Sequence, residues 1–152
     1  MAYCFDTSAL LDAWVRWYPI DVFPSFWEKM EQLISDDVLL APDEIYAELE
    51  RKEDDLHAWV KSRKNMFCSL DIATIVEVKK ILKDHPRLVD TQKGRSQADP
   101  FVIALARTKG LTVVTGESFG TAAKPKIPYV CGQLGVPSIG IVQFIRQNKW
   151  NF

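Results

Sequence analysis

The sequence is poor in the residues that build disulfide frameworks and zinc sites. It contains three cysteines and two histidines: Cys4, Cys68, Cys131, His57 and His85. The cysteines are odd in number, lie far apart and form no Cys-x-x-Cys pair, which excludes a disulfide scaffold and a zinc ribbon. The histidines show no metal-ligand spacing. We therefore expect free thiols and a reduced, cytoplasmic setting.

Long apolar runs and glycine-rich loops are also missing. No stretch of about 18 apolar residues occurs, so no membrane span is expected. The first residues, Met-Ala-Tyr-Cys-Phe-Asp, lack the basic region of a signal peptide. The lack of a glycine-rich phosphate loop excludes nucleotide hydrolysis of the P-loop type.

The chain has no excess of positive charge. Its net charge of −1 argues against a general nucleic-acid-coating protein, since such proteins are usually basic. This charge still allows an enzyme that holds nucleic acid through a bound metal and a local basic patch. The chain does have 47% apolar residues over 152 positions, enough for the core of a single domain spanning residues 1–152.

Short apolar runs alternate with segments of helical periodicity along the chain. Strands are predicted at residues 3–5, 38–41, 66–68, 111–115 and 136–142. Helical segments are predicted around residues 8–15, 26–34, 42–48, 56–60, 72–82 and 98–109, with a last helix from Phe144. Residues 87–97 and 120–128 are expected to be loops. This alternation predicts an α/β fold with a mostly parallel central sheet and helices on both faces.

Four acids fall where such a sheet would gather them at one edge. They are Asp6, Glu48, Asp99 and Glu117. Ligands of open α/β sheets bind outside the carboxyl ends of the strands. Clustered carboxylates repel one another, and a divalent cation is the usual compensation. The pattern therefore favours metal-dependent phosphodiester chemistry.

Each acid also has a purely structural interpretation. Asp6 could cap the helix that follows, although Thr7 and Ser8 could cap it equally well, so an acid is not required there. Asp99 precedes a proline, a common way to open a helix, and Glu117 could be an exposed turn residue. The order of the four acids along the alternating pattern is what points to one site.

Two acids of the third helical segment compete for that site. Glu44 stands in the first turn, where a carboxylate is favoured by the positive helix end. Ile45 and Leu49 define the buried stripe of this helix. At 100° per residue, Glu48 lies roughly 80° from the middle of the stripe and Glu44 roughly 120°. Glu48 is preferred, with Glu44 as the alternative.

Four segments resemble those of the PIN-domain nucleases, and within them the VapC-type toxins of bacterial and archaeal toxin–antitoxin pairs. They are Phe-Asp-Thr-Ser-Ala-Leu-Leu, Ala-Pro-Asp-Glu-Ile-Tyr-Ala-Glu-Leu, Ala-Asp-Pro-Phe-Val-Ile-Ala-Leu-Ala and Val-Val-Thr-Gly-Glu-Ser-Phe. The Ala-Asp-Pro-Phe and Val-Thr-x-Glu forms are similar to a subgroup of uncharacterised PIN proteins. The resemblance implies a three-layer PIN-like fold, Mg²⁺ or Mn²⁺ as cofactor, endonucleolytic cleavage of RNA, and a cognate antitoxin as partner.

The resemblance also implies roles for individual residues. The acidic positions of the family match Asp6, Glu48, Asp99 and Glu117, which become the expected catalytic and metal-binding residues. Thr7, Ser8 and Thr115 are expected to support them by orienting metal ligands or water. The fourth acid of the family is usually Asp. The extra methylene of Glu moves the carboxylate outward, so whether it is a direct ligand stays open.

Contacts beyond the acids are predicted from charge and aromatic content. Lys93 and Arg95 could contact RNA phosphates, as could Lys124 and Lys126, or these could be solubilising surface residues. The aromatic cluster at residues 14–18 could form a homodimer or antitoxin surface, since aromatics are enriched at interfaces. Ordinary burial in the core is the alternative for these rings.

Three other function classes match the sequence less well than the nuclease does. A haloacid-dehalogenase-like phosphatase requires a second Asp two residues after the first, where this chain has Ser8. A receiver-like domain requires paired acids after the first strand, where this chain has Asp-Thr-Ser. A catalytically weak PIN scaffold that binds RNA or protein remains the non-enzyme alternative.

Overall fold

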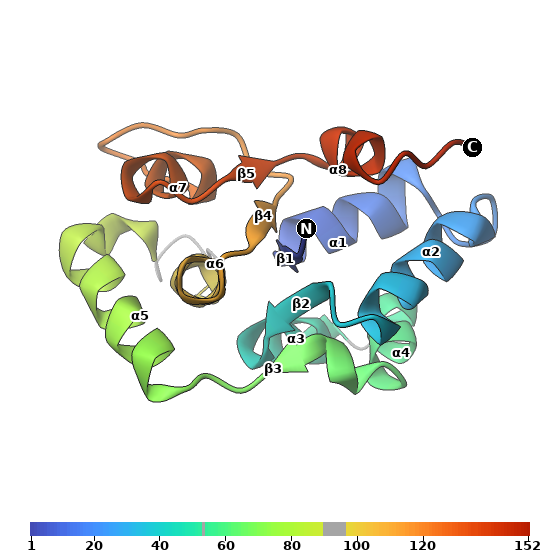
Figure 1. Ribbon diagram of the computed structural model, residues 1–152, viewed down its shortest axis with the longest axis horizontal. Coiled ribbons are helices and arrows are strands. Elements are labelled where there is room, and N and C mark those ends of the chain that lie inside the picture. The colour runs from blue at the N-terminus through green and yellow to red at the C-terminus, as the bar shows by residue number, and fades with distance from the viewer. Residues whose placement is uncertain (53, 90–96) are drawn as a thin grey trace.

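Five parallel strands form the centre of the computed structural model, which describes residues 1–52, 54–89 and 97–152. The strands are β1 (Tyr3–Phe5), β2 (Leu39–Pro42), β3 (Phe67–Cys68), β4 (Thr112–Val114) and β5 (Ser138–Ile139). Their order in the sheet is β3-β2-β1-β4-β5, and every neighbouring pair is parallel (Figure 1).

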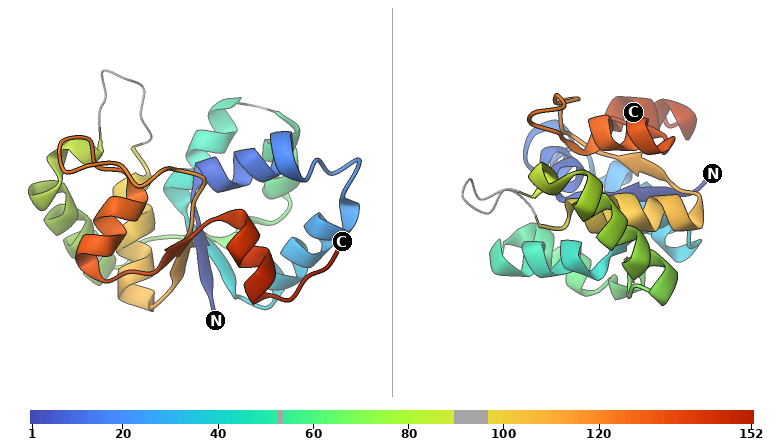
Figure 2. Two further views of the ribbon diagram at one scale, coloured as in Figure 1. Left: turned by 90° about the horizontal axis from the view of Figure 1, so that it is seen from above. Right: turned by 90° about the vertical axis from the view of Figure 1, so that its left-hand side faces the viewer.

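Helices cover both faces of this sheet, so the molecule has three layers (Figures 1 and 2). One face carries α1 (Thr7–Leu11) with its π-helical continuation Asp12–Trp17, α2 (Pro24–Ser35), α3 (Asp43–Lys52), α4 (Asp55–Lys61) and α8 (Ile141–Gln147). The other face carries α5 (Ile72–Asp84), α6 (Asp99–Lys109) and α7 (Ile127–Leu134). Short 3-10 turns at Lys64–Met66 and Pro86–Leu88 join these elements. The predicted α/β architecture is confirmed.

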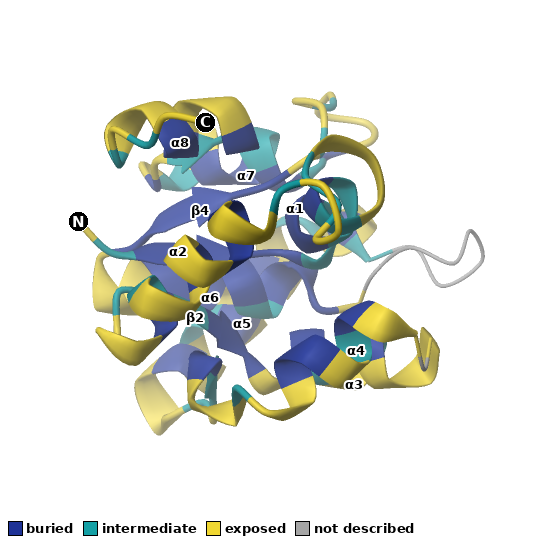
Figure 3. Ribbon diagram, turned by 90° about the vertical axis from the view of Figure 1, so that its right-hand side faces the viewer, coloured by how far each residue is buried: buried dark blue, intermediate teal, exposed yellow. Residues whose placement is uncertain are grey.

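The central strand is buried on both sides. Tyr3–Phe5 is at most 3% exposed, and the buried residues follow the strands and the inward faces of the helices (Figure 3). Aromatic rings fill much of the layer above β1: Phe144 of α8 packs edge-on against Tyr3 and Phe5, and Trp27 of α2 packs against Trp14. In the described ranges, no helix combines the length and the apolar character needed to cross a bilayer.

The C-terminal third differs from the sequence-based expectation. Residues 120–128 were predicted to be a loop, but helix α7 begins at Ile127. Residues 136–142 were predicted to be one strand, but only Ser138–Ile139 pairs with β4, and α8 begins at Ile141. The apolar run is split because Gly140, with an extended backbone, is the N-cap of α8. A buried apolar run does not by itself distinguish a strand from a helix start.

The first helical segment also departs from its predicted periodicity. An α-helix over the predicted segment 8–15 would place Val15 on the same apolar stripe as Leu11, but Val15 is 65% exposed. The backbone over Asp12–Trp17 is π-helical, and the Tyr18 N–H bonds the carbonyl of Ala13 five residues earlier. This wider turn shifts the phase of the side chains, so the α-helical spacing predicts the wrong face.

Candidate active site

Asp6 follows β1 directly and caps helix α1. Its Oδ1 accepts the Ala9 N–H at 2.8 Å, from an extended backbone. The argument that Thr7 or Ser8 would cap this helix, leaving no structural need for an acid, is wrong. An Asp at the N-cap position reaches the N–H three residues on. Capping therefore accounts for part of the reason an acid stands here.

Two hydroxyl groups hold the Asp6 carboxylate in place. Ser8 Oγ lies 2.9 Å from both Asp6 oxygens as a donor, and Thr115 Oγ1 donates to Oδ2. Each hydroxyl oxygen in turn accepts a backbone N–H, Ser8 from Gly116 at 2.9 Å and Thr115 from Glu117 at 3.1 Å. An ionised carboxylate only accepts hydrogen bonds, so the hydrogens of both hydroxyl groups are directed at Asp6.

The Asp6 carboxylate is nevertheless costly to ionise. It is 2% exposed, and burial raises its pKa from 3.8 to about 7. The hydrogen bonds from Thr115, Ala9 and Ser8 lower this pKa, and the nearby negative charge of Glu117 raises it again. A buried carboxylate with a second acid beside it is an environment that a divalent cation would stabilise.

Glu48 links the sequence neighbours of two other predicted acids. Its Oε2 accepts the hydroxyl of Thr7, the residue after Asp6. Its Oε1 accepts the N–H of Ala98, the residue before Asp99, at 3.3 Å. Helix α3 thereby joins the start of α1 to the start of α6.

Asp99 is the first residue of α6 and is 5% exposed. The sequence suggested that it caps this helix. The N-cap is instead Ala98, which provides no side-chain hydrogen bond, so capping does not explain the acid. A buried Asp in the first turn does benefit from the positive end of the helix.

Glu117 is the third residue after β4 and is half-buried. Its Oε2 accepts the N–H of Ile127 at 3.0 Å, the first residue of α7. The acid expected to be a metal ligand or an exposed turn residue is therefore engaged with a helix N-terminus. Its charge still reaches Asp6, as the pKa of Asp6 shows.

Glu44, the alternative to Glu48, has different surroundings. Burial raises the pKa of its carboxyl group. Its Oε2 is buried without a hydrogen-bond partner in the part of the chain that the structure describes. Glu48, and not Glu44, is hydrogen-bonded to Thr7.

The oxygens of these acids are suitable ligands for a hard cation, but the acids lie too far apart for three of them to share one. All the donors are carboxylate oxygens, which Mg²⁺ and Mn²⁺ prefer. Within residues 1–52, 54–89 and 97–152, no three His, Cys, Asp or Glu side chains lie close enough together to hold a metal ion. Binding of one ion by three of these side chains would require them to move closer together.

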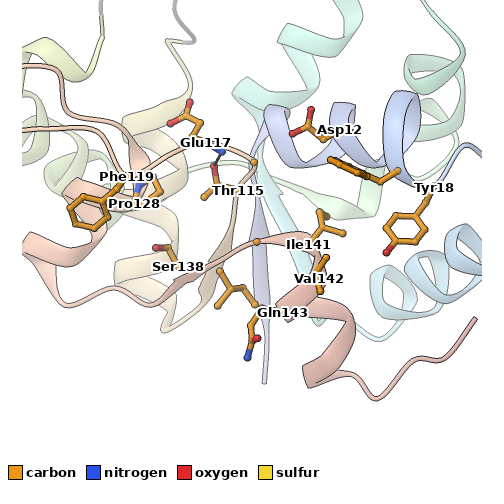
Figure 4. Close-up of a pocket in the computed structure, with 14 residues that line it drawn as sticks. Asp12, Tyr18, Thr115, Glu117, Phe119, Pro128, Ser138, Ile141, Val142 and Gln143 are labelled. Atoms are coloured by element: carbon orange, nitrogen blue, oxygen red, sulfur yellow. Dashed lines mark hydrogen bonds between the residues drawn. The ribbon is translucent and has the colours of Figure 1, made fainter.

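A cavity of about 560 Å³ adjoins Glu117 beyond the ends of β4 and β5, and its lining reaches from the π-helical segment to the first turns of α7 and α8. Thr115 and Glu117 form its middle, Asp12 and Tyr18 stand on one side, and Phe119 and Pro128 stand at the other end (Figure 4). The remaining lining residues are Trp17, Gly116 and the segment 138–143 at the start of α8.

Two residues near the acids were missed by sequence reasoning. Asp12 was not among the predicted site residues, yet it lines the cavity and its Oδ2 lies directly against Gly116. Its spacing of four from Ser8 was a usable signal, because such residues share a helix face. Burial, with the charges of Asp6 and Glu117, raises the pKa of Cys131 to about 12. Cys131 could not be placed because helix α7 was not predicted.

Only two of the four predicted phosphate contacts, Lys124 and Lys126, fall within the residues that the structure describes. Lys93 and Arg95 fall outside the described residues. Lys124 is exposed, and Lys126 Nζ lies 3.2 Å from Ser118 Oγ in the segment that follows Glu117. Their role with RNA stays a prediction.

Comparison with known proteins gives one family and a fold. A family described as a domain of unknown function, DUF4411, matches residues 3–152. No curated protein matches the sequence. The structure of VapBC2 from Rickettsia felis, bound to a DNA fragment from their promoter, is similar at 13% identity. That match covers 92% of this chain and 98% of the other, with a TM-score of 0.54.

A second solved structure is a weaker match. PAE2754 from Pyrobaculum aerophilum is 16% identical, with 89% of this chain and 97% of the other covered and a TM-score of 0.42. The likeness to the VapBC2 structure shows that the fold is PIN/VapC-like, as the sequence segments suggested.

Proposed function

The chain belongs to the DUF4411 family, and from this premise and its PIN-like fold we propose that it is a metal-dependent endoribonuclease. One observation carries the proposal. Asp6, at the carboxyl end of the central strand, is buried, has its pKa raised to about 7, and has a second acid, Glu117, near enough to raise it. Perturbed acids at the carboxyl edge of a parallel sheet are typical of a catalytic site.

The proposed roles follow from the contacts. Asp6, Glu48, Asp99 and Glu117 would hold Mg²⁺ or Mn²⁺. The bound ion would polarise the RNA phosphate and make a water molecule a stronger nucleophile. Ser8 and Thr115 keep the Asp6 carboxylate in one orientation. Thr7 does the same for Glu48. No side chain of the protein acts as the nucleophile in this scheme.

The proposed biological role is that of a toxin in a toxin–antitoxin pair, acting in the cytoplasm. The motif resemblance supports this role, as does the fold shared with a structure that contains VapBC2. The partner would be a cognate antitoxin, with a homodimer as a further assembly. Growth arrest on expression, relieved by the product of a neighbouring gene, would distinguish a toxin from a housekeeping nuclease.

A second candidate function is a PIN scaffold that binds RNA or protein with little catalysis. The observation that favours it is the engagement of Glu117 with Ile127, together with the lack of a three-residue metal-binding group in the described ranges. This alternative predicts binding of RNA or protein that is independent of added metal.

The deciding experiment is cleavage of single-stranded RNA with and without Mn²⁺. We expect cleavage by the wild type that stops on chelation, and background cleavage by Asp6→Asn. The matched control is Asp84→Asn, which removes an exposed acid at the end of α5 and should cleave like the wild type. Equal cleavage by Asp6→Asn and the wild type would refute the proposed site.

A further inference from the structure

Two large aromatic side chains at the cavity beside the acids are more than half exposed, although the Phe119 ring also packs edge-on against Tyr129. Trp17 is 61% exposed and Phe119 is 60% exposed, and both line the cavity. The other tryptophans pack into ring clusters, as Trp27 does with Trp14 and Trp59. Exposed aromatics at a concave site are typical of a ligand-binding surface.

We propose that this cavity binds an unpaired nucleobase of the RNA, next to the phosphate that is cleaved. The inference rests on the proposed nuclease function and names a binding subsite for its substrate. The cavity and the acid site share a wall: Thr115 lines the cavity and donates its hydroxyl hydrogen to Asp6. A base in the cavity would therefore place the phosphate of its nucleotide beside the acids.

The size and lining of the cavity fit a flat heterocycle. Its volume of about 560 Å³ lies in the range of small-molecule sites. Trp17 and Phe119 offer faces on which a base can stack, which is how proteins bind single-stranded RNA with modest sequence preference. The base is neutral, so the acids that line the cavity do not repel it as they would repel a bare phosphate.

Asp12 supplies a means of choosing between bases. Its carboxylate lines the cavity, lies against Gly116 and is 3.8 Å from the exposed Arg16 guanidinium. An ionised carboxylate only accepts hydrogen bonds, so it favours bases with amino donors, namely adenine, cytosine and guanine. Uracil has no amino group and offers only its N3–H as a donor, so it presents fewer donor hydrogens to this carboxylate and would bind less well.

The test measures binding without catalysis. Fluorescein-labelled, unstructured homopolymers of A, C and U are titrated with the full chain in excess chelator, and anisotropy is recorded. Trp17→Ala and Phe119→Ala should each weaken binding by about tenfold, the usual loss when one stacked base is released. The matched control, Ile72→Ala, removes an 81% exposed apolar side chain on α5 and should bind like the wild type.

Asp12→Asn tests the recognition step separately. An amide can donate as well as accept, so this near-isosteric variant should reduce the preference for A and C over U while still binding RNA. Trp17 and Phe119 are exposed, so the thermal midpoints of their variants should match the wild type. This match confirms that any lost affinity is not lost folding.

Three results of the binding test would overturn the inference. They are RNA affinity at the wild-type level in both aromatic variants, an equal loss of RNA affinity in Ile72→Ala, and loss from these variants of a protein that co-purifies with the wild type while RNA affinity stays intact. The last result would assign the cavity to a protein segment. Tight, Trp17-dependent binding without Mn²⁺-dependent cleavage would support the subsite and refute the nuclease. Mn²⁺-dependent RNA cleavage that is unchanged in Trp17→Ala and Phe119→Ala would support the nuclease and refute the subsite.

Discussion

At the scale of single residues, the central feature is a carboxyl group that folding makes harder to ionise. Burial raises the pKa of Asp6 from 3.8 to about 7. Between these two values the folded chain binds more protons than the unfolded chain, so stability falls as pH rises. The stabilising contribution is fully present below the unfolded pKa and is lost by the time pH reaches the folded pKa.

This linkage gives a prediction for the metal-free protein. The free energy of unfolding should decrease from about pH 4 to about pH 7, by up to a few kcal/mol for this one group. Urea unfolding across this range measures the slope. Asp6→Asn removes the titrating group and should flatten the curve, whereas Asp84→Asn should leave it unchanged. If the free energy of unfolding of Asp6→Asn falls with pH as steeply as that of the wild type, a group other than Asp6 dominates the pH dependence.

Thr115 should act as a positioning residue for Asp6. Thr115→Val removes the hydroxyl that donates to Asp6 Oδ2, so the pKa of Asp6 should rise further. Mn²⁺ affinity should fall by about 10- to 100-fold, as expected when the partner of a metal ligand is lost. Calorimetric titration measures the affinity. Thr115→Ser keeps the hydroxyl donor and should keep the Mn²⁺ affinity at the wild-type level. A loss of Mn²⁺ affinity in Thr115→Ser would assign Thr115 a packing role only.

At the scale of elements, the segment after β4 approaches the π-helical segment very closely. A Cβ on Gly116 would collide with Asp12 Oδ2. Because the colliding atom is the end of the Asp12 side chain, which can turn aside, Gly116→Ala should destabilise the fold by at most about 1 kcal/mol, the low end of the cost of overpacking. Gly132→Ala in α7 is the matched control. A Cβ there would meet only Phe119 atoms at 3.8 and 4.0 Å, and helix propensity should stabilise this variant by about 0.5–1 kcal/mol.

A double variant separates the collision from other effects of Gly116. If the clash is the cause, Asp12→Ala should remove most of the penalty of Gly116→Ala in chemical unfolding. Additive losses in the double variant would instead point to backbone strain at position 116.

The elements that were predicted well carry unambiguous local signals. The strand before Asp6 and the helix after Asp71 have clear periodicity, and Gly110, with a φ of +68°, ends α6 where the sequence placed the stop. The region after Gly116 could not be read in the same way. Its helix α7 has a proline at its start, and its cap comes from Glu117, ten residues away. Local patterns do not contain that contact.

The same limit applies to the site residues. The sequence identified buried Asp6 and Asp99 by their positions at element ends, and Glu48 by its place on a helix face. It could not show that Ser8 and Thr115 share Asp6, because these hydroxyls come from segments 107 residues apart. It also missed Asp12, although the spacing of four from Ser8 indicated a shared helix face.

At the scale of the whole molecule, a metal at the acid edge should stabilise the entire fold. A cation that binds only the folded chain raises the thermal midpoint in proportion to its occupancy. We expect Mn²⁺ to raise the midpoint more at about pH 8 than at about pH 5, because the pKa of Asp6 lies near 7. Scanning calorimetry in matched ionic strength tests this, with Asp6→Asn as the variant that should not respond.

The hydrogen bond from Ile127 N–H to Glu117 Oε2 gives the acid edge a route to the surface. A carboxylate has two oxygens, so Glu117 can accept this N–H with Oε2 and offer its other oxygen to a cation beside Asp6. Loading the site would then tie the first turn of α7 to the cation through a single side chain. Whatever touches the start of α7 would be coupled to site occupancy through that carboxylate, without any movement of the sheet.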